Sequence, residues 1–206
     1  MRLAIRHTTR YRFSEPVAHG LQRLRLTPKT TQGQSIIDWT MTFENARLEL
    51  EYDDQNYNRV SLISVEEGAQ QVVVTSAGTV LTEDKAGVFG HHSGHLPLWA
   101  FLGPTELTRP GPRIKQLIGG VRRSPEGMVP TLHNLSAAIR EQVGYEAGCT
   151  GVDTTPEGAV TGGRGVCQGH PHAFIGAARS LEIPARYVSG YLMMNDRVEQ
   201  EATHAW

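Results

Sequence analysis

The sequence contains few cysteines, no excess of either charge and no long apolar run. Its 206 residues include 2 cysteines, 20 Lys and Arg residues and 21 Asp and Glu residues, for a formal net charge of -1. So few cysteines argue against a disulfide framework. The balanced charge provides neither a basic surface for a nucleic acid nor an acidic tail, and no segment approaches the roughly 18–20 apolar residues that span a membrane. We therefore expect partners chosen by a local site, with no nucleic acid and no membrane among them.

The N-terminus also lacks the pattern of a signal peptide. Residues 1–7 begin directly with an alternation typical of a strand, without a long apolar core or a small-residue cleavage site. We expect a cytoplasmic protein. In that reducing compartment a cysteine is more often reactive than disulfide-bonded.

The first hundred residues show the alternation of β-strands. Segments rich in β-branched and aromatic residues recur between turn clusters such as 53–56. These segments are residues 2–7, 10–13, 21–26, 36–43, 59–65 and 71–80. Short strands at this spacing predict an antiparallel, sandwich-like or meander-like β domain.

Residues 87–112 have the composition of a connection between two domains. They contain several glycines and prolines, together with apolar residues such as Trp99 and Phe101 that would pack the segment down. We place the domain boundary near residue 110, which gives a β-rich domain at 1–110 and a second domain at 111–206.

The second domain shows the spacing of helices. We predict helices at 113–122, at 131–143 with Thr131 as N-cap, and at 171–181. Strands are predicted at 185–193 and from 203, and 151–165 is expected to be a loop with one helical turn near Pro156. The buried stripe of the last helix is expected to consist of small and apolar residues, Ala173, Phe174, Ala177, Ala178 and Leu181. The whole chain is thus predicted to belong to the α+β class.

The stretch from 162 to 172 holds the residue with the clearest chemistry. Three glycines, at 162, 163 and 165, free the backbone before Cys167, and a helix is expected to follow. A thiol at a helix N-terminus lies near unpaired N–H groups and the positive end of the dipole, which favour the nucleophilic thiolate. A lone cysteine is more commonly buried and structural, so local features leave both interpretations open. Cys149 lies in a loop without this context, and we interpret it as structural.

Several separated motifs together resemble the bacterial transglutaminase-like superfamily. They are GRGVCQ at 163–168, His172, IPARYVSGYL at 183–192 and THAW at 203–206. Two further motifs, HTTRY at 7–11 and RLTP at 25–28, are similar to the β-rich domain that precedes the core in many bacterial members. The resemblance covers nearly the whole chain.

This resemblance implies a papain-like cysteine enzyme, with Cys167 as nucleophile and His204 as its acid/base partner. The backbone N–H of Cys167 is implied as an oxyanion donor, and residues 111–206 are implied to form a helix packed on an antiparallel sheet. The expected substrate is a protein or peptide, attacked at a peptide or glutaminyl amide to give a Cys thioester. The thioester would then pass to water or to an amine. No cofactor and no metal are expected, and no oligomeric state is assigned.

Two departures from the family pattern are visible. Family members usually carry Asp, an aromatic residue and Ala after the Cys-Gln pair, where this chain has Gly169, His170 and Pro171, so the helix is expected to begin near Pro171. The third catalytic residue, an Asp, is expected beyond residue 206, on a part of the core that this truncated chain would lack. None of the nearby acids is assigned to that role, namely Asp153, Asp196, Glu199 and Glu201. A Cys-His pair without its orienting acid is expected to be nearly inactive, since loss of that acid costs about four orders of magnitude in a serine triad.

Two other classes of function stay open. Zinc could be held by Cys167 and His170 with His172, Cys149 or His204, and His91, His92 and His95 form a second histidine cluster. The first set lacks paired CxxC or HxxxH spacing, and the second lies in a turn-rich connection, which argues against a native metal site. The other alternative is a catalytically inactive, protein-binding scaffold of the same fold, because a fold alone does not establish activity.

Overall fold

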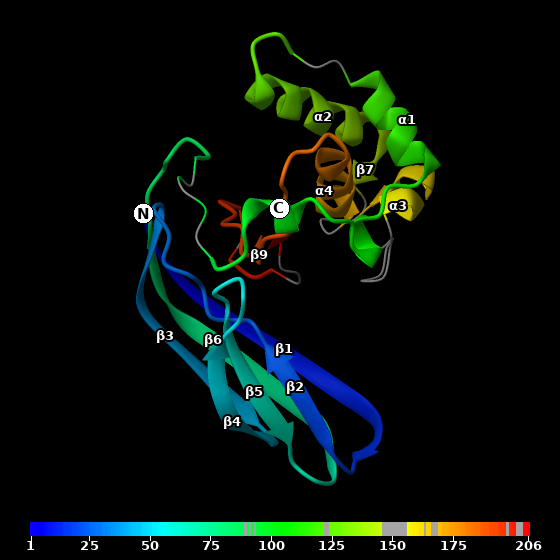
Figure 1. The fold of residues 1–206 in the computed structure, drawn as a ribbon. Coiled ribbons are helices and arrows are strands. Elements are labelled where there is room, and N and C mark those ends of the chain that lie inside the picture. The colour runs from blue at the N-terminus through cyan, green and yellow to red at the C-terminus, as the bar shows by residue number, and fades with distance from the viewer. Residues whose placement is uncertain are drawn as a thin grey trace. The chain divides into compact units, whose positions relative to one another are not determined.

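The computed structural model describes residues 1–88, 90, 92, 94–121, 124–145, 156–162, 164–165, 169–196, 198–200 and 204–206. The chain forms two compact units, Met1–Leu96 and Pro97–Trp206. Strands build the first unit, whereas the second holds helices and short strand pairs (Figure 1). The α+β class predicted from the sequence is therefore confirmed. Within the described parts of the chain, no helix is long and apolar enough to cross a membrane.

The first unit consists of two three-stranded antiparallel sheets, with strand orders β1-β6-β3 and β2-β5-β4. The strands are β1 (Arg2–Val17), β2 (Gly20–Leu24), β3 (Gln34–Glu44), β4 (Ala46–Asp53), β5 (Arg59–Val65) and β6 (Ala69–Thr82). Buried side chains of both sheets form one core, in which Leu24 and Ile63 of one sheet join Val72 and Val74 of the other. The two sheets thus share an apolar interior, as in a β-sandwich.

A β-bulge in β3 requires a glycine in the middle of β6. The pairing register between these strands shifts between Ile36 and Asp38. A Cβ atom at Gly78 would lie 2.2 Å from the Asp38 carbonyl oxygen and 2.6 Å from Cε3 of Trp39. Only a residue without a side chain fits there, which is a common reason for a glycine inside a strand.

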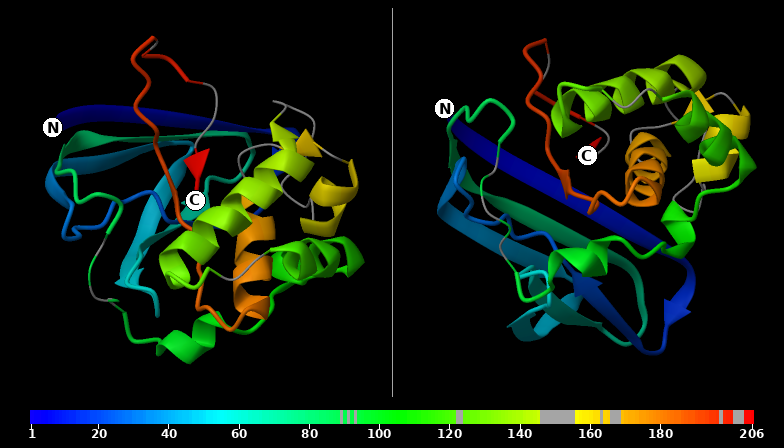
Figure 2. Two further views of the ribbon diagram at one scale, coloured as in Figure 1. Left: turned by 90° about the horizontal axis from the view of Figure 1, so that it is seen from above. Right: turned by 45° about the horizontal axis from the view of Figure 1, so that its top comes forward.

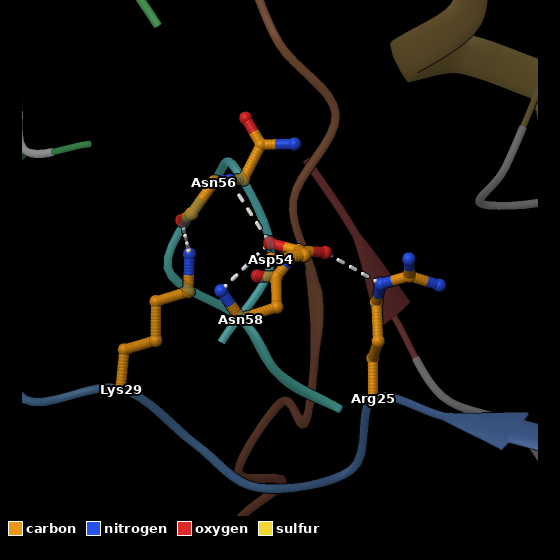
Figure 3. A network of polar contacts seen from close by, with 5 residues as sticks. All are labelled: Arg25, Lys29, Asp54, Asn56 and Asn58. Carbon is orange, nitrogen blue, oxygen red and sulfur yellow. Dashed lines mark hydrogen bonds and ion pairs between the residues drawn. The ribbon is translucent and has the colours of Figure 1, made fainter. Parts of the chain in front are cut away.

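The loop between β4 and β5 is held by a carboxylate that accepts four hydrogen bonds (Figure 3). Oδ1 of Asp54 accepts the backbone N–H groups of Asn56 and Asn58, each at 2.9 Å. Its Oδ2 accepts Nε of Arg25 at 2.8 Å and the side-chain amide of Asn58 at 2.9 Å. The ammonium of Lys29 donates to the Asn56 carbonyl. Residues that follow β2 are thereby tied to the tip of the β4–β5 hairpin.

In the described part of the second unit, four helices surround one apolar core. They are α1 (Pro112–Gly120), α2 (Met128–Gln142), α3 (Pro156–Gly162) and α4 (Gly169–Ser180). The alanines at 173, 177 and 178 of α4 are fully buried and contact apolar residues of α1 and α2 such as Ile114 and Leu135. The two views of Figure 2 show α4, in orange, among the other three helices. The small side chains let these helices pack closely, and the predicted buried stripe is confirmed, with Phe174 and Leu181 partly buried at its edge.

Two helices, α2 and α4, begin two or three residues earlier than predicted. The N-cap of α2 is Gly127 rather than Thr131, which lies inside the helix and donates its hydroxyl to the Gly127 carbonyl at 2.9 Å. Because the first-turn N–H groups of a helix have no partner, Pro130 is tolerated at the third helical position and the helix extends back to Met128. Likewise, α4 begins at Gly169, two residues before the predicted start at Pro171.

The strands of the second unit are short. They form a parallel pair, β7 (Gly144–Tyr145) with β8 (Arg164–Gly165), and an antiparallel pair, β9 (Ser189–Gly190) with β10 (His204–Ala205). The strand predicted at 185–193 is therefore wrong in length. Within the described residues, only Ser189–Gly190 of this segment pairs as a strand. The segment near Pro156 forms the seven-residue helix α3 instead of a single turn.

Residues 97–110, which the prediction assigned to the first domain, belong to the second unit. They include two 3₁₀ helices, η1 (Leu98–Phe101) and η2 (Glu106–Thr108). Phe101 is buried, and its carbonyl oxygen accepts the backbone N–H of Ala185 at 3.2 Å. Thr108 is also buried. Since these contacts join the segment to residues after α4, the units divide at Leu96 and Pro97 rather than near residue 110.

Candidate active site

The connection between β8 and α4 contains the predicted nucleophile. β8 ends at Gly165 and α4 begins at Gly169. Cys167, together with its backbone N–H as predicted oxyanion donor, lies in this connection and outside the described residues, as does Cys149. A helix thus follows the cysteine, as predicted, while the geometry of the thiol itself stays a prediction.

The residues that depart from the family pattern fix the start of α4. The ring Nε2–H of His170 donates to the carbonyl oxygen of Val143 at 2.9 Å, just before β7. Pro171 is buried at the third helical position, where no backbone hydrogen-bond donor is needed. Gly169 is buried as well. These three residues therefore anchor the helix that follows Cys167, in place of the Asp-aromatic-Ala sequence usual in the family.

The second predicted catalytic residue, His204, lies on β10. This strand pairs with β9, so that His204 lies opposite Gly190 and Ala205 opposite Ser189. Two further backbone hydrogen bonds extend the pairing, from Val188 to Trp206 at 2.9 Å and back at 2.8 Å. The imidazole is half-buried, and its ring centre lies 6.3 Å from that of Trp206. A strand pair thus holds the histidine by its backbone, which restricts its position without using its side chain.

A contact between two aromatic rings links α4 to the segment that leads into β9. The rings of His172 and Tyr187 lie 5.0 Å apart, centre to centre, at an angle of 34°. His172 is five residues after Cys167, and Tyr187 is three residues before Gly190, the partner of His204. The contact therefore joins α4 to the segment that leads into β9, the strand that pairs with β10.

His172 differs from the other histidines in its surroundings. It is 8% exposed, and its Nδ1 atom is shielded from solvent without a hydrogen-bond partner. Burial lowers the pKa of its imidazole, because the charged form loses hydration that no partner replaces. We expect a neutral ring at pH 7. The motif comparison named His172 but did not predict that its side chain is buried. The only sequence feature that points to His172 is its position five residues after the cysteine.

Arg179 was also missed, and it joins three segments of the second unit. Its Nη1 donates to the Gly103 carbonyl at 2.7 Å and to the Thr108 hydroxyl at 3.1 Å. Nε and Nη2 donate to the Ala185 carbonyl at 3.0 and 2.8 Å. Burial lowers the pKa of this guanidinium, though not enough to discharge an arginine at physiological pH. The side chain locks residues 103–108 and 185 onto α4.

Both candidate zinc sets lie only partly within the described residues, because Cys149, Cys167 and His91 fall outside them. The described residues contain no group of three or more His, Cys, Asp or Glu side chains arranged to hold a metal ion. Nε2 of His92 donates to the Leu96 carbonyl at 2.7 Å, and Nδ1 of His95 lies 3.2 Å from the hydroxyl of Tyr57. These two imidazoles are thus engaged separately. His91 lies outside the described residues, as do Asp153 and Glu201, while Asp196 and Glu199 are exposed.

Two family models match the chain, one in each unit. The model of the bacterial transglutaminase-like N-terminal region matches residues 3–81. The model of the transglutaminase-like superfamily matches residues 115–206, a range that includes both Cys167 and His204. The division of the matches agrees with the strand-built first unit and the helical second unit.

Mycobacterial proteins and one protein of known structure are similar to this chain over its full length. An uncharacterised protein of Mycobacterium leprae is 27% identical over 220 residues, covering 100% of this chain and 78% of that protein. One from Mycobacterium tuberculosis is 24% identical over 229 residues, covering 100% and 72%. A crystal structure from Cytophaga hutchinsonii, described as a candidate cysteine protease, matches with a TM-score of 0.77 and 20% identity. It covers 100% of this chain and 71% of that chain, and at this identity the likeness concerns the fold.

Proposed function

This chain belongs to the transglutaminase-like superfamily, with a bacterial transglutaminase-like N-terminal region before the core, and on that basis we propose that it is a cysteine enzyme acting on peptide or glutaminyl amides. Cys167 is the nucleophile and His204 the acid/base partner. The observation that carries the proposal is that the core match spans both residues, while their neighbouring elements, α4 and the β9–β10 pair, meet through His172 and Tyr187.

The proposed reaction follows from the chemistry of the pair. His204 takes the proton of the Cys167 thiol, and the thiolate attacks the amide carbonyl to form a tetrahedral oxyanion. The backbone N–H of Cys167 donates a hydrogen bond to that oxyanion. His204 then gives its proton to the departing amine, the C–N bond breaks and a thioester is left. Water or a second amine attacks the thioester and restores the thiol, so the outcome is hydrolysis or transamidation.

Local structure supports these roles. The N-terminal turn of α4 presents backbone N–H groups without helical partners, which favour a thiolate in the connection before it. His170 and the buried Pro171 fix that turn against the end of α2. The ladder of β9 and β10 fixes the backbone of His204. An acid that orients the imidazole is part of the proposed mechanism, and we expect it beyond residue 206.

The test is turnover of glutaminyl and peptide amides by the full-length protein, which includes the acid expected beyond residue 206, and by four of its variants. Release of ammonia or of a peptide amine is followed with and without an added primary amine, to separate transamidation from hydrolysis. Cys167→Ala and His204→Ala should each lose at least about a hundredfold in kcat, whereas Cys149→Ala and the exposed His133→Ala should keep the wild-type rate. Wild-type turnover in both site variants would refute the assignment. A wild-type protein that turns over no amide would favour the inactive scaffold.

A further inference from the structure

The helix α4 has a second face, opposite the alanine stripe, that borders a pocket of the second unit. The pocket has a volume of about 450 Å³, within the roughly 300–1,000 Å³ of small-molecule sites. It lies among α4, the 3₁₀ helix η2 and the segment before β9. Its lining consists of Thr105, Leu107, Thr108, His172, Ile175, Arg179 and Tyr187. His204 is not among these lining residues, and Cys167 lies outside the described residues; the ligand proposed here is additional to the reaction proposed for that pair.

One end of the pocket carries a cation, Arg179, for which the described residues supply no ion-pair partner. All four hydrogen bonds of Arg179 go to neutral acceptors, two backbone carbonyls and a hydroxyl. An arginine has five N–H donors, so one donor on Nη2 has no acceptor among the described residues. The ion pairs found in the described residues all lie between residues 25 and 85, in the other unit. A partly buried positive charge without an ion-pair partner among the described residues favours an anionic ligand.

The other end carries an unsatisfied histidine. Nδ1 of the 92%-buried His172 has no hydrogen-bond partner, whereas buried polar atoms in folded proteins are usually paired. His172 and Arg179 are seven residues apart on one helix, hence about 10 Å apart along its axis. Between them, the wall is formed by apolar surface of Leu107, Ile175 and the Tyr187 ring.

From these features we propose that the pocket binds a carboxylate carried on an apolar body. The carboxylate accepts the free N–H of Arg179, and the apolar body lies along Ile175. A polar group at the far end of the ligand pairs with the imidazole of His172, whose ring turns to present Nδ1. A phosphate fits less well, because its three acceptor oxygens would meet one free guanidinium donor. Such a carboxylate can belong to a free organic acid or to an acidic residue of a peptide.

The binding experiment uses matched acids and amides on the full chain. 4-Phenylbutanoate and 4-phenylbutanamide are titrated to about 10 mM while backbone amide shifts are recorded by NMR. The peptides acetyl-Phe-Glu-amide and acetyl-Phe-Gln-amide form the second arm. We expect saturable shifts in residues 105–108 and 172–179, with the acid of at least one pair bound about tenfold more tightly than its amide. Binding by the peptide acid alone assigns the ligand to peptides, and binding by both acids assigns it to carboxylates in general.

Variants separate the pocket from other causes of binding. Arg179→Gln should weaken binding of the acid about tenfold and abolish its advantage over the amide, whereas Arg140→Gln on the exposed end of α2 should change neither. His172→Phe removes the nitrogens but keeps a ring, and His133→Phe is its surface control. Leu107→Trp fills the pocket from η2 and should abolish binding even if Arg179→Gln does not fold. Equal affinity for acid and amide, no saturable shift with any probe, or unchanged binding in Leu107→Trp would each overturn the proposal.

Discussion

Replacing Asp54 by alanine removes the acceptor for four hydrogen bonds in the loop between β4 and β5. Two of the donors are the backbone N–H groups of Asn56 and Asn58, and both donate to Oδ1 of Asp54. The third is the amide of Asn58 and the fourth is Arg25. Tyr57, inside the same loop, has a φ of 55°, a left-handed conformation that is uncommon for a residue other than glycine. The carboxylate therefore stabilises a turn that is unfavourable by itself.

The expected loss of stability can be worked out from these contacts. Each backbone N–H left without an acceptor costs about 1 kcal/mol or more. The ion pair with Arg25 is worth about 1 kcal/mol, because the arginine side chain is 43% exposed and regains water when the pair is lost. Asn58 can turn its amide to solvent at little cost. We therefore expect Asp54→Ala to lower the free energy of unfolding of the first unit by about 2–4 kcal/mol.

Urea unfolding at pH 7 measures this loss if the signal comes from the first unit alone. Trp39 is the only tryptophan of residues 1–96, so a Trp99→Phe, Trp206→Phe background isolates its fluorescence. Lys85→Ala is the control, since Lys85 and Glu83 form an ion pair whose side chains are 44% and 62% exposed, and such pairs contribute about 0–1 kcal/mol. A loss for Asp54→Ala no larger than that of Lys85→Ala would refute the role of the carboxylate.

The same network predicts how the first unit responds to acid. Burial alone would raise the pKa of Asp54, but the hydrogen bonds from Arg25, from the Asn58 amide and from two backbone N–H groups outweigh it and hold the pKa well below its usual range. Because the folded pKa is depressed, the stabilisation is complete above the unfolded value of 3.8 and is lost as the pH falls below it. Removing one of these donors with Arg25→Ala should shift the acid unfolding of the first unit to higher pH.

Three further predictions concern the second unit and can be followed by helical circular dichroism. Gly176→Ala should lower its stability by about 1–3 kcal/mol, because a Cβ there would lie 2.6 Å from the Thr108 carbonyl oxygen; unchanged stability would show that η2 does not approach α4 so closely. Glu157→Ala should cost about 0.5–2 kcal/mol as a lost helix cap, since its carboxylate accepts two N–H groups of the first turn of α1 at 2.8 and 3.3 Å, and an unaltered urea midpoint would contradict that role. Because burial lowers the pKa of His172, the unit should lose stability as the pH falls below the unfolded value of 6.5, and His172→Phe should reduce this loss.

The fold could be predicted where one face of an element is buried in a regular pattern. The alanine stripe of α4 is an example, because its spacing of three and four residues leaves little alternative to a helix. In contrast, β4 was missed although it pairs along its length with β5. Its side chains alternate between charged residues such as Glu49 and apolar ones such as Leu50, and all but Ala46 are exposed. The strands were predicted from segments rich in β-branched and aromatic residues, of which β4 has only Tyr52, so this alternation was overlooked.

The candidate site could be predicted in its motifs but not in its packing. Cys167 and His204 were identified by resemblance, and their roles stay predictions. The burial of His172 and the hydrogen bonds of Arg179 depend on residues 103–108 folding back onto α4, a contact between segments about seventy residues apart. Sequence spacing describes one element at a time and does not report such long-range contacts. The pocket between these segments could therefore not be predicted from the sequence.

The most direct test of the proposed enzyme compares the alkylation rates of the two cysteines in one molecule. Iodoacetamide labelling at pH 6–8 is followed at Cys167 and Cys149 by peptide mass spectrometry, in the full-length wild-type protein and in its His204→Ala variant. If Cys167 is a thiolate paired with His204, it should react at least about tenfold faster than Cys149 at pH 6, and His204→Ala should remove most of that advantage. Equal rates at the two cysteines, or a fast Cys167 that is unaffected by the loss of His204, would contradict the proposed catalytic pair.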